Sequence, residues 1–113
     1  MCSEAVLTEI TSQVVQYAID YFGDKLDKVI LYGSYARGDY NSESDIDIMV
    51  LVDISREEAC RVDNELNKLA NALGYKHDVL VSLFIKDCET FYKYLPVEPF
   101  YMNVMKEGVL LSA

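Results

Sequence analysis

Two aspartates inside an apolar segment set the strongest constraint on how this chain can fold. The segment DIDIMVLVD, residues 45–53, places Asp45 and Asp47 at the start of a run that is otherwise apolar as far as residue 52. Successive side chains of a strand point to opposite faces, so the two carboxylates share one face and the apolar residues at 46, 48, 50 and 52 form the other. Two carboxylates that close together repel each other, and one tends to keep a proton unless a cation lies between them. The strand therefore carries a candidate metal site.

A glycine–serine pair ends the preceding apolar segment. That segment, KVILY at residues 28–32, is short and β-branched, which favours a buried strand, and it stops at Gly33 and Ser34. Glycine lets the backbone come close to a ligand, and residues 34–37, SYAR, can form a helical turn whose free N–H groups face a phosphate. A phosphate site beside a carboxylate pair indicates a metal-assisted nucleotide site.

Positive charge at such a site can come from Arg37 and from Mg²⁺. Arg37 either contacts a phosphate or forms a surface ion pair with Asp39 or Glu43, and the sequence does not choose between them. Mg²⁺ prefers oxygen ligands and is usually held by one or two carboxylates together with substrate phosphates. Two such ions can bind both the attacking and the leaving oxygen of a phosphoryl transfer. We therefore expect Mg²⁺ as the cofactor.

The rest of the chain predicts an α/β or α+β fold, with a small mixed β-sheet flanked by helices. Helical spacing of apolar residues predicts a helix over residues 4–22, and a capping box at Ser55 begins a second helix that we expect to end at Gly74. The loop between the first two strands is too short for an ordinary helical crossover, so the sheet is expected to be mixed. The other predicted elements are a strand over residues 78–85, a short helix from Asp87 to about Leu95, and a last helix from Pro99 to near Gly108.

Length and composition indicate one domain over residues 1–113. The chain is 51% hydrophobic and 26% charged, which is enough apolar content for a single core. Its net charge of −9 makes extended DNA or RNA a poor partner for the chain alone, because a protein that follows a phosphate backbone needs the opposite sign. A small anionic ligand that arrives with divalent cations is compatible with this charge.

Neither a membrane nor an oxidising compartment is expected. No apolar run approaches the roughly 20 residues of a membrane span, and the first residues, MCSEAVLTEI, carry acids where an export signal carries bases. Cys2, Cys60 and Cys88 are far apart and outside any CxxC pattern, which indicates free thiols in a reducing cytoplasm and no zinc site. The segment FYKYLPVEPFYMNVM, residues 91–105, is compatible with an interface, a homo-oligomeric one included, or with closure of the core.

The spacing of the site residues resembles that of one superfamily. Ten residues separate Ser34 from Asp45, and Gly-Ser-x10-Asp-x-Asp is the pattern of the DNA polymerase β-like nucleotidyltransferases. The segments GSYARGD and SDIDIMV are similar to those of the minimal nucleotidyltransferases of bacteria and archaea, which are single small domains often encoded beside a helical HEPN-domain partner. The resemblance extends from about residue 29 to residue 108 and is most specific over residues 33–52.

The resemblance implies transfer of a nucleoside monophosphate, usually AMP from ATP, to an acceptor hydroxyl with release of pyrophosphate. In the family the two aspartates of the motif hold two Mg²⁺ ions, a role that would fall on Asp45 and Asp47. The glycine–serine pair, here Gly33 and Ser34, would bind the triphosphate. The implied partner is a HEPN toxin, modified typically on a tyrosine, with this chain as the antitoxin.

A third carboxylate on a later strand completes the family's site, and its position here is open. Asp78 is the only acid of the expected strand HDVLVSLF, and we expect it to be the third metal ligand and a catalytic residue. If the position falls on Ser82 instead, the carboxylate is absent, and alternation cannot decide because both residues share a face. Without it the chain would be a non-catalytic antitoxin or regulatory subunit that binds nucleotide and partner. An antibiotic-modifying enzyme of the same fold is a further alternative, against which the small size of the chain argues.

Overall fold

The computed structural model describes residues 3–41 and 43–112, and its four-stranded sheet with flanking helices confirms the predicted fold class. None of the helices in these residues is both long enough and apolar enough to cross a membrane. The helices are α1 (Glu4–Phe22), α2 (Ser34–Arg37), α3 (Arg56–His77), α4 (Cys88–Tyr94) and α5 (Pro99–Glu107), with a 3₁₀ helix over Gly23–Lys25. The strands are β1 (Leu26–Tyr32), β2 (Ile46–Val52), β3 (Val81–Asp87) and β4 (Val109–Ser112).

The sheet is mixed, as the short connection between its first two strands predicts. The strand order is β3-β2-β1-β4. β1 pairs antiparallel with both β2 and β4, whereas β2 pairs parallel with β3. The parallel pair is joined through α3, the kind of helical crossover that parallel strands require. β2 therefore lies inside the sheet, and all its residues except Asp47 are buried.

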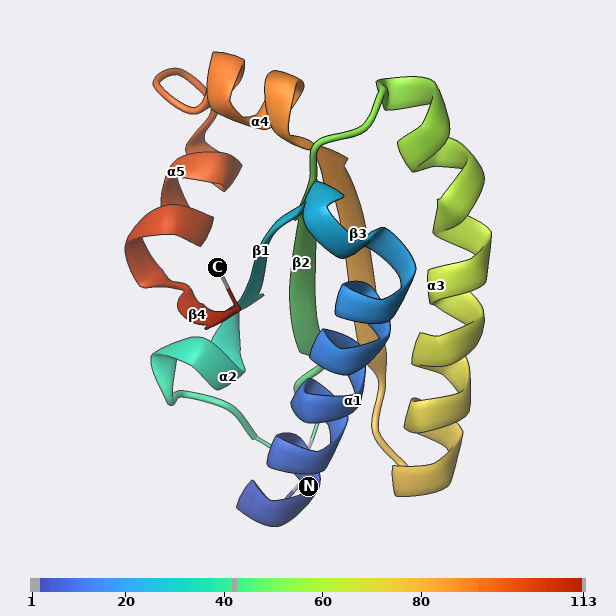
Figure 1. Ribbon diagram of the computed structural model, residues 1–113. Coiled ribbons are helices and arrows are strands. Elements are labelled where there is room, and N and C mark those ends of the chain that lie inside the picture. Colours follow the sequence, from blue (N-terminus) through green and yellow to red (C-terminus); the bar gives the residue numbers. More distant parts are fainter. Residues whose placement is uncertain (1–2, 42, 113) are drawn as a thin grey trace.

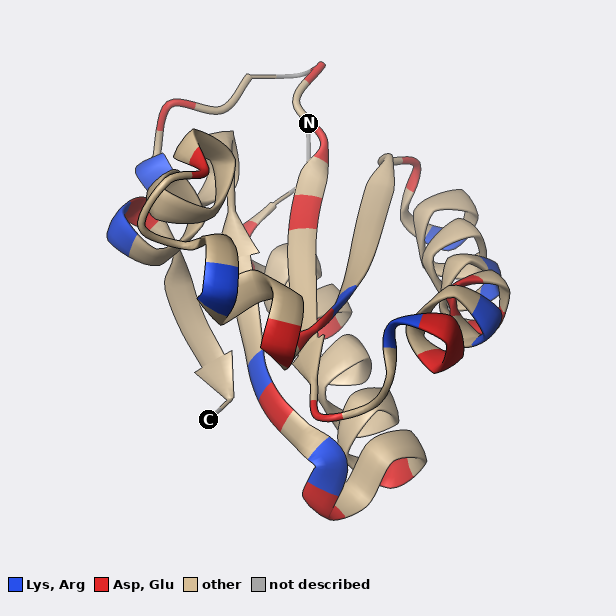
Figure 2. Ribbon diagram, turned by 90° about the horizontal axis from the view of Figure 1, so that it is seen from above, with Lys and Arg blue, Asp and Glu red and all other residues tan. Residues whose placement is uncertain are grey.

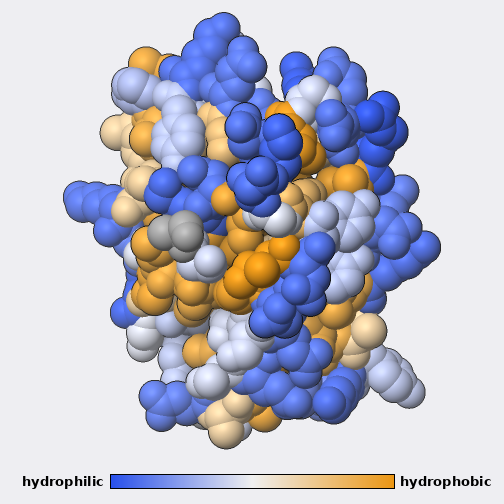
Figure 3. Space-filling view, in the orientation of Figure 1, coloured by the Kyte–Doolittle hydropathy of each residue, from blue (hydrophilic) through white to orange (hydrophobic). Residues whose placement is uncertain are grey.

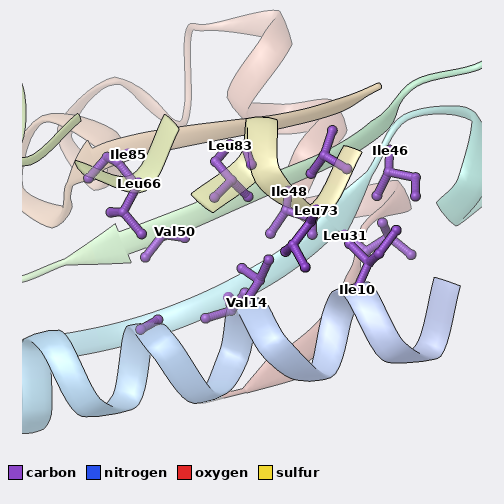
Figure 4. Packing of buried hydrophobic residues seen from close by; sticks show 14 of the residues in the cluster. Ile10, Val14, Leu31, Ile46, Ile48, Val50, Leu66, Leu73, Leu83 and Ile85 are labelled. Atoms are coloured by element: carbon purple, nitrogen blue, oxygen red, sulfur yellow. The ribbon is translucent and has the colours of Figure 1, made fainter. Parts of the chain in front are cut away.

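Helices α1 and α3 cover one face of the sheet (Figure 1). They pack on the side of β2 that carries the apolar residues at 46, 48, 50 and 52, which the alternation places on one face. Figure 4 shows Ile10 and Val14 of α1 directed toward the sheet, and Leu66 and Leu73 of α3 belong to the same cluster. Burial of this apolar surface is the main source of stability, at about 25 cal/mol per Å². In Figure 2, basic and acidic residues are interspersed along α3, so this helix presents no basic stripe to a nucleic acid.

Helices α4 and α5 lie on the opposite face of the sheet. Phe91 of α4 and Val104 of α5 pack with Ile30, Met49 and Leu51 in a second, smaller core. Asp47 precedes Met49 by two residues on this same face and is only half-buried. The aspartate therefore lies at the margin of the apolar contact that these helices make.

Capping residues begin the helices where the sequence predicted. The side chains of Ser3, Ser55 and Asp87 each accept a hydrogen bond from a backbone N–H in the first turn of α1, α3 and α4. Pro99 occupies the first turn of α5, where its missing N–H has no intrahelical partner to lose. These local signals are sufficient to place the starts of four helices.

The end of α3 and the start of β3 differ from the prediction. α3 continues beyond Gly74, and its C-terminal cap is Asp78, at a φ of 53° in the left-handed region. The strand that we expected from Asp78 begins only at Val81. Gly74 lies inside the helix, where it leaves room for the turn that follows: a Cβ there would lie 2.5 Å from the carbonyl oxygen of Val79.

β4 is a strand that the sequence analysis did not predict. Its four residues follow Gly108 and pair with β1, which lies far away in the chain. The strand is at the sheet edge, where Val109 and Leu110 stay about half exposed, and apolar surface is visible beside this end of the chain in Figure 3. Cys60 and Cys88 are free thiols, and Cys2 lies outside the described residues.

Candidate nucleotide site

Three residues form a row across one end of the sheet. The strand register pairs Tyr32 of β1 with Asp47 of β2, and Asp47 with Ser82 of β3. Residues that are paired on neighbouring strands project to the same face, so all three side chains point to the side of the sheet on which α5 lies. Asp45 lies one residue before β2 and two before Asp47.

Asp47 is the central carboxylate of this row. Burial raises its pKa, the charge of Asp45 raises it further, and the charge of Arg37 lowers it. These causes show that Asp45 and Arg37 both lie within electrostatic reach of Asp47. The structure thus brings the two predicted aspartates together as a repelling pair, and a divalent cation would relieve that repulsion.

Gly33 lies directly against Asp47. It caps α2 at φ 77° and ψ −156°, a backbone conformation that is essentially restricted to glycine. A Cβ at this position would also lie 2.5 Å from Asp47 Oδ2, so any side chain would displace the carboxylate. The carbonyl of Gly33 accepts hydrogen bonds from the N–H groups of Ala36 and Arg37, both at 3.1 Å, which forms the predicted helical turn from Ser34. Glycine is required here for its conformation and for the closeness of the aspartate.

Arg37 is engaged by two acids at the edge of a cavity. Its Nε donates to Asp39 Oδ2 at 3.1 Å, and a terminal guanidinium nitrogen donates to Glu107 Oε2 of α5 at 3.4 Å. The side chains are 39% to 61% exposed, so these ion pairs are weak. Of the two alternatives for Arg37, the free protein therefore shows the surface ion pair with Asp39, and Glu107 is a second partner. The cavity has a volume of about 390 Å³ and is lined by Tyr32, Gly33, Arg37, Phe100, Asn103, Val104 and Glu107.

Tyr32 and Phe100 are site residues that the sequence analysis did not single out. Burial, together with the nearby charge of Asp47, raises the pKa of Tyr32 to about 12. The ring of Phe100 makes edge contacts with Tyr32 and with Phe84 of β3, at centroid distances of 5.6 Å and 6.0 Å. Phe100 reaches the site from α5, so the aromatic content of residues 91–105 was the only signal in the sequence.

The structure places Ser82, and not Asp78, opposite Asp47. The same face of β3 continues with Phe84 and Lys86, so β3 offers no acid on the side of Asp47. Asp78 caps α3 and lines a cavity of about 340 Å³ together with residues of α3, which covers the other face of the sheet. The pairing of β2 with β3 does not support Asp78 as the third metal ligand. It favours the alternative, in which the position of the family's third carboxylate falls on Ser82.

The donor set fits Mg²⁺ held jointly by the protein and a nucleotide. Asp45 and Asp47 offer carboxylate oxygens, and Mg²⁺ commonly takes one or two of these with phosphates and waters as its other ligands. Within residues 3–41 and 43–112, no group of three or more His, Cys, Asp or Glu side chains could hold a metal ion by itself. Phosphate oxygens of a ligand would have to complete the coordination.

Comparison with known sequences identifies the family. The sequence profile described as "Nucleotidyltransferase domain" matches residues 12–111, which include the glycine–serine turn and the aspartate pair. The chain belongs to this family. In this nucleotidyltransferase domain, the glycine–serine turn follows β1 and the aspartate pair lies at the start of the neighbouring β2.

Two curated relatives come from Methanocaldococcus jannaschii, and each is named "Putative protein adenylyltransferase". One is 37% identical over 87 residues, which cover 77% of this nucleotidyltransferase domain and 79% of the relative. The other is 45% identical over 62 residues, which cover 55% of this chain and 61% of the relative. The match therefore spans a little under two thirds of that second relative.

Solved structures of toxin–antitoxin complexes share the fold. A toxin–antitoxin with AMP-PNP superimposes with a TM-score of 0.53 at 23% identity and covers 89% of this chain and 72% of that one. A tri-AMPylated Shewanella oneidensis HEPN toxin in complex with an MNT antitoxin gives a TM-score of 0.50 at 20% identity and covers 95% of this chain and 72% of that one. These likenesses show the nucleotidyltransferase fold.

Proposed function

We propose that this chain transfers a nucleoside monophosphate, AMP from ATP, to a hydroxyl group on a partner protein. The observation that carries the proposal is the close approach of the Gly33 backbone to the Asp47 carboxylate, which joins the turn that would bind phosphates to the acids that would bind a metal ion. The adjoining cavity of about 390 Å³ offers space for part of a nucleotide. The names of the two archaeal relatives support ATP as the donor and a protein as the acceptor.

Each residue of the site has a separate task in this reaction. Asp45 and Asp47 would hold Mg²⁺, which when bound offsets the charge of the triphosphate and polarises its phosphoryl oxygens. The bare backbone at Gly33 and the hydroxyl and N–H of Ser34 would position the phosphates. Arg37 would exchange its exposed acidic partners for phosphate oxygens, because its ion pairs in the free protein are weak. The acceptor oxygen would then displace pyrophosphate at the α-phosphorus.

The partner that we propose is a HEPN-domain protein. A solved structural neighbour is an MNT antitoxin in complex with a HEPN toxin that carries three AMP groups. This chain shares the fold of that antitoxin, and its net charge of −9 disfavours an extended nucleic acid as the acceptor. We therefore propose an antitoxin role in which a protein hydroxyl on the toxin receives AMP.

A second candidate function is a non-catalytic one, and one observation favours it. Ser82 lies opposite Asp47, where a third carboxylate would assist activation of the acceptor hydroxyl. A chain without this group could bind ATP and its partner and act by binding alone. The two candidate functions share the nucleotide site and differ only in whether transfer follows.

Transfer of label from α-³²P-ATP in Mg²⁺ tests the proposal, with the product of the neighbouring gene or a cell lysate as acceptor. Asp47→Asn removes one charge from the site, and Asp24→Asn, at an exposed position in the 3₁₀ helix, is the matched control. We expect label on a discrete protein with the parent and with Asp24→Asn, and its loss with Asp47→Asn. ATP binding and complex formation without transfer to the true partner would favour the binding role. A parent chain that does not bind ATP would contradict both.

A further inference from the structure

The number of divalent cations that the nucleotide site can bind depends on the acids that its strands carry. Sites with two metal ions hold them about 3.5–4 Å apart and need ligands that both ions can share or divide. At that distance two divalent cations repel each other strongly, so the acids around them decide whether the second ion binds. The question is therefore which acids this fold brings to the Asp47 side of the sheet.

β3 brings none. Its residues on the face of Asp47 are Ser82, Phe84 and Lys86, which are a neutral hydroxyl, an aromatic ring and a cation. Ser82 is the one directly opposite Asp47, and a serine hydroxyl offers neither the charge nor the two oxygens of a carboxylate. Lys86 adds a positive charge farther along the same face, which disfavours additional cations there.

The other acids near the site make different contacts in the free protein. Asp78 caps α3 and lines a cavity with that helix, on the layer that covers the opposite face of the sheet. In the free protein, Glu107 of α5 and Asp39 both accept from the guanidinium of Arg37, at 3.4 Å and 3.1 Å, and neither lies on a strand that carries Asp47 or Ser82. The described part of the chain accordingly contains no cluster of three potential metal-binding side chains.

We infer that the site takes a single divalent cation, held between Asp45, Asp47 and the phosphates of the nucleotide, and that Ser82 leaves no second cation site. This inference rests on the proposed function, because the nucleotide completes the coordination. One cation is sufficient to bind a nucleoside triphosphate, since Mg²⁺ is often held by one or two carboxylates and phosphate oxygens. The proposed transfer then has no metal ion on the acceptor side.

Counting bound Mn²⁺ tests the inference without any measurement of activity. Mn²⁺ is titrated into the full chain with a stoichiometric amount of AMP-PNP, and free Mn²⁺ is followed by its electron paramagnetic resonance signal. We expect one Mn²⁺ per bound nucleotide for the parent and for Asp78→Asn. Ser82→Asp places a carboxylate opposite Asp47, and we expect it to raise the count to two, with Ser82→Asn as the uncharged control that stays at one.

Each outcome separates this inference from the proposed function. Two Mn²⁺ ions in the parent would overturn the inference and leave the proposed function intact, and a fall to one in Asp78→Asn would identify Asp78 as the missing ligand. A count that stays at one in a folded Ser82→Asp variant would overturn the assignment of Ser82 to the third position. A parent that binds no AMP-PNP would overturn the proposed function and this inference together. Circular dichroism checks that each variant is folded, and the parent count decides the main point by itself.

Discussion

The backbone of Gly33 and the carboxylate of Asp47 are in contact, and a Cβ on residue 33 would lie 2.5 Å from Asp47 Oδ2. Gly33 directly follows β1 and Asp47 belongs to β2, so the contact depends on the antiparallel register that pairs Asp47 with Tyr32. It joins the two halves of the candidate site, the turn that would bind phosphates and the acid that would bind a cation. Four predictions test this geometry and the packing that supports it.

Gly33→Ala should weaken nucleotide binding at least tenfold at a moderate cost in stability. The backbone conformation of Gly33 costs an L-residue about 1–3 kcal/mol, and the new methyl group must also displace the Asp47 carboxylate. Gly38→Ala is the matched control, because Gly38 has a φ of 84° but open space around its Cβ position. Calorimetric titration with Mg²⁺–AMP-PNP should show at least a tenfold loss of affinity for Gly33→Ala alone. An equal loss in both variants would contradict a specific role for Gly33.

Asp47→Asn should raise the thermal stability of the metal-free protein near neutral pH. Burial and the charge of Asp45 raise the pKa of Asp47 in the folded chain, so its ionised form disfavours folding. The sign follows from linkage: stability is greater below the unfolded-state pKa of about 4 and falls as the pH rises through the folded-state pKa. In the presence of a chelator we expect a gain of a few degrees in Tm at pH 7 that disappears near pH 3. A gain that does not vary with pH would contradict the electrostatic cause, and Asp24→Asn is the control.

Glu107→Gln should tighten nucleotide binding slightly. Glu107 competes with phosphate for Arg37, and an exposed ion pair of this kind is worth about 0.2–1 kcal/mol, which corresponds to an affinity gain of up to about fivefold. Glu65→Gln removes the comparable exposed pair with Lys68 on α3, far from the cavity, and should leave the affinity unchanged. Titration with AMP-PNP at low salt measures both variants. Weaker binding by Glu107→Gln would mean that Glu107 positions Arg37 for the phosphate instead of competing for it.

Gly74→Ala should destabilise the fold although alanine favours a helix. Its Cβ would lie 2.5 Å from the carbonyl oxygen of Val79, which belongs to the turn before β3. Overpacking of this kind costs about 1–3 kcal/mol, and urea unfolding measures it. Asn71→Ala, at an exposed position one turn earlier in α3, is the control and should change the free energy of unfolding little. A more stable Gly74→Ala variant would show that the turn can move away.

The sequence by itself determined the parts of the site that are close together in the chain. Gly33, Ser34, Asp45 and Asp47 lie within fifteen residues of one another, and the alternation of β2 decides which face carries the acids. The starts of the helices could also be predicted from the sequence, because a capping side chain such as Ser55 or Asp87 binds the backbone of the first turn of its own helix. These features depend on local backbone geometry.

Tertiary structure alone decided which residues join that local motif. Asp78 and Ser82 have the same parity, so only the start of β3 at Val81 and its pairing with β2 could place Ser82 opposite Asp47. Gly74 leaves room for the turn before β3, because a Cβ there would lie 2.5 Å from the carbonyl oxygen of Val79. The contributions of α5 and β4 likewise come from contacts between distant segments, and the period of a sequence pattern carries no information about such contacts.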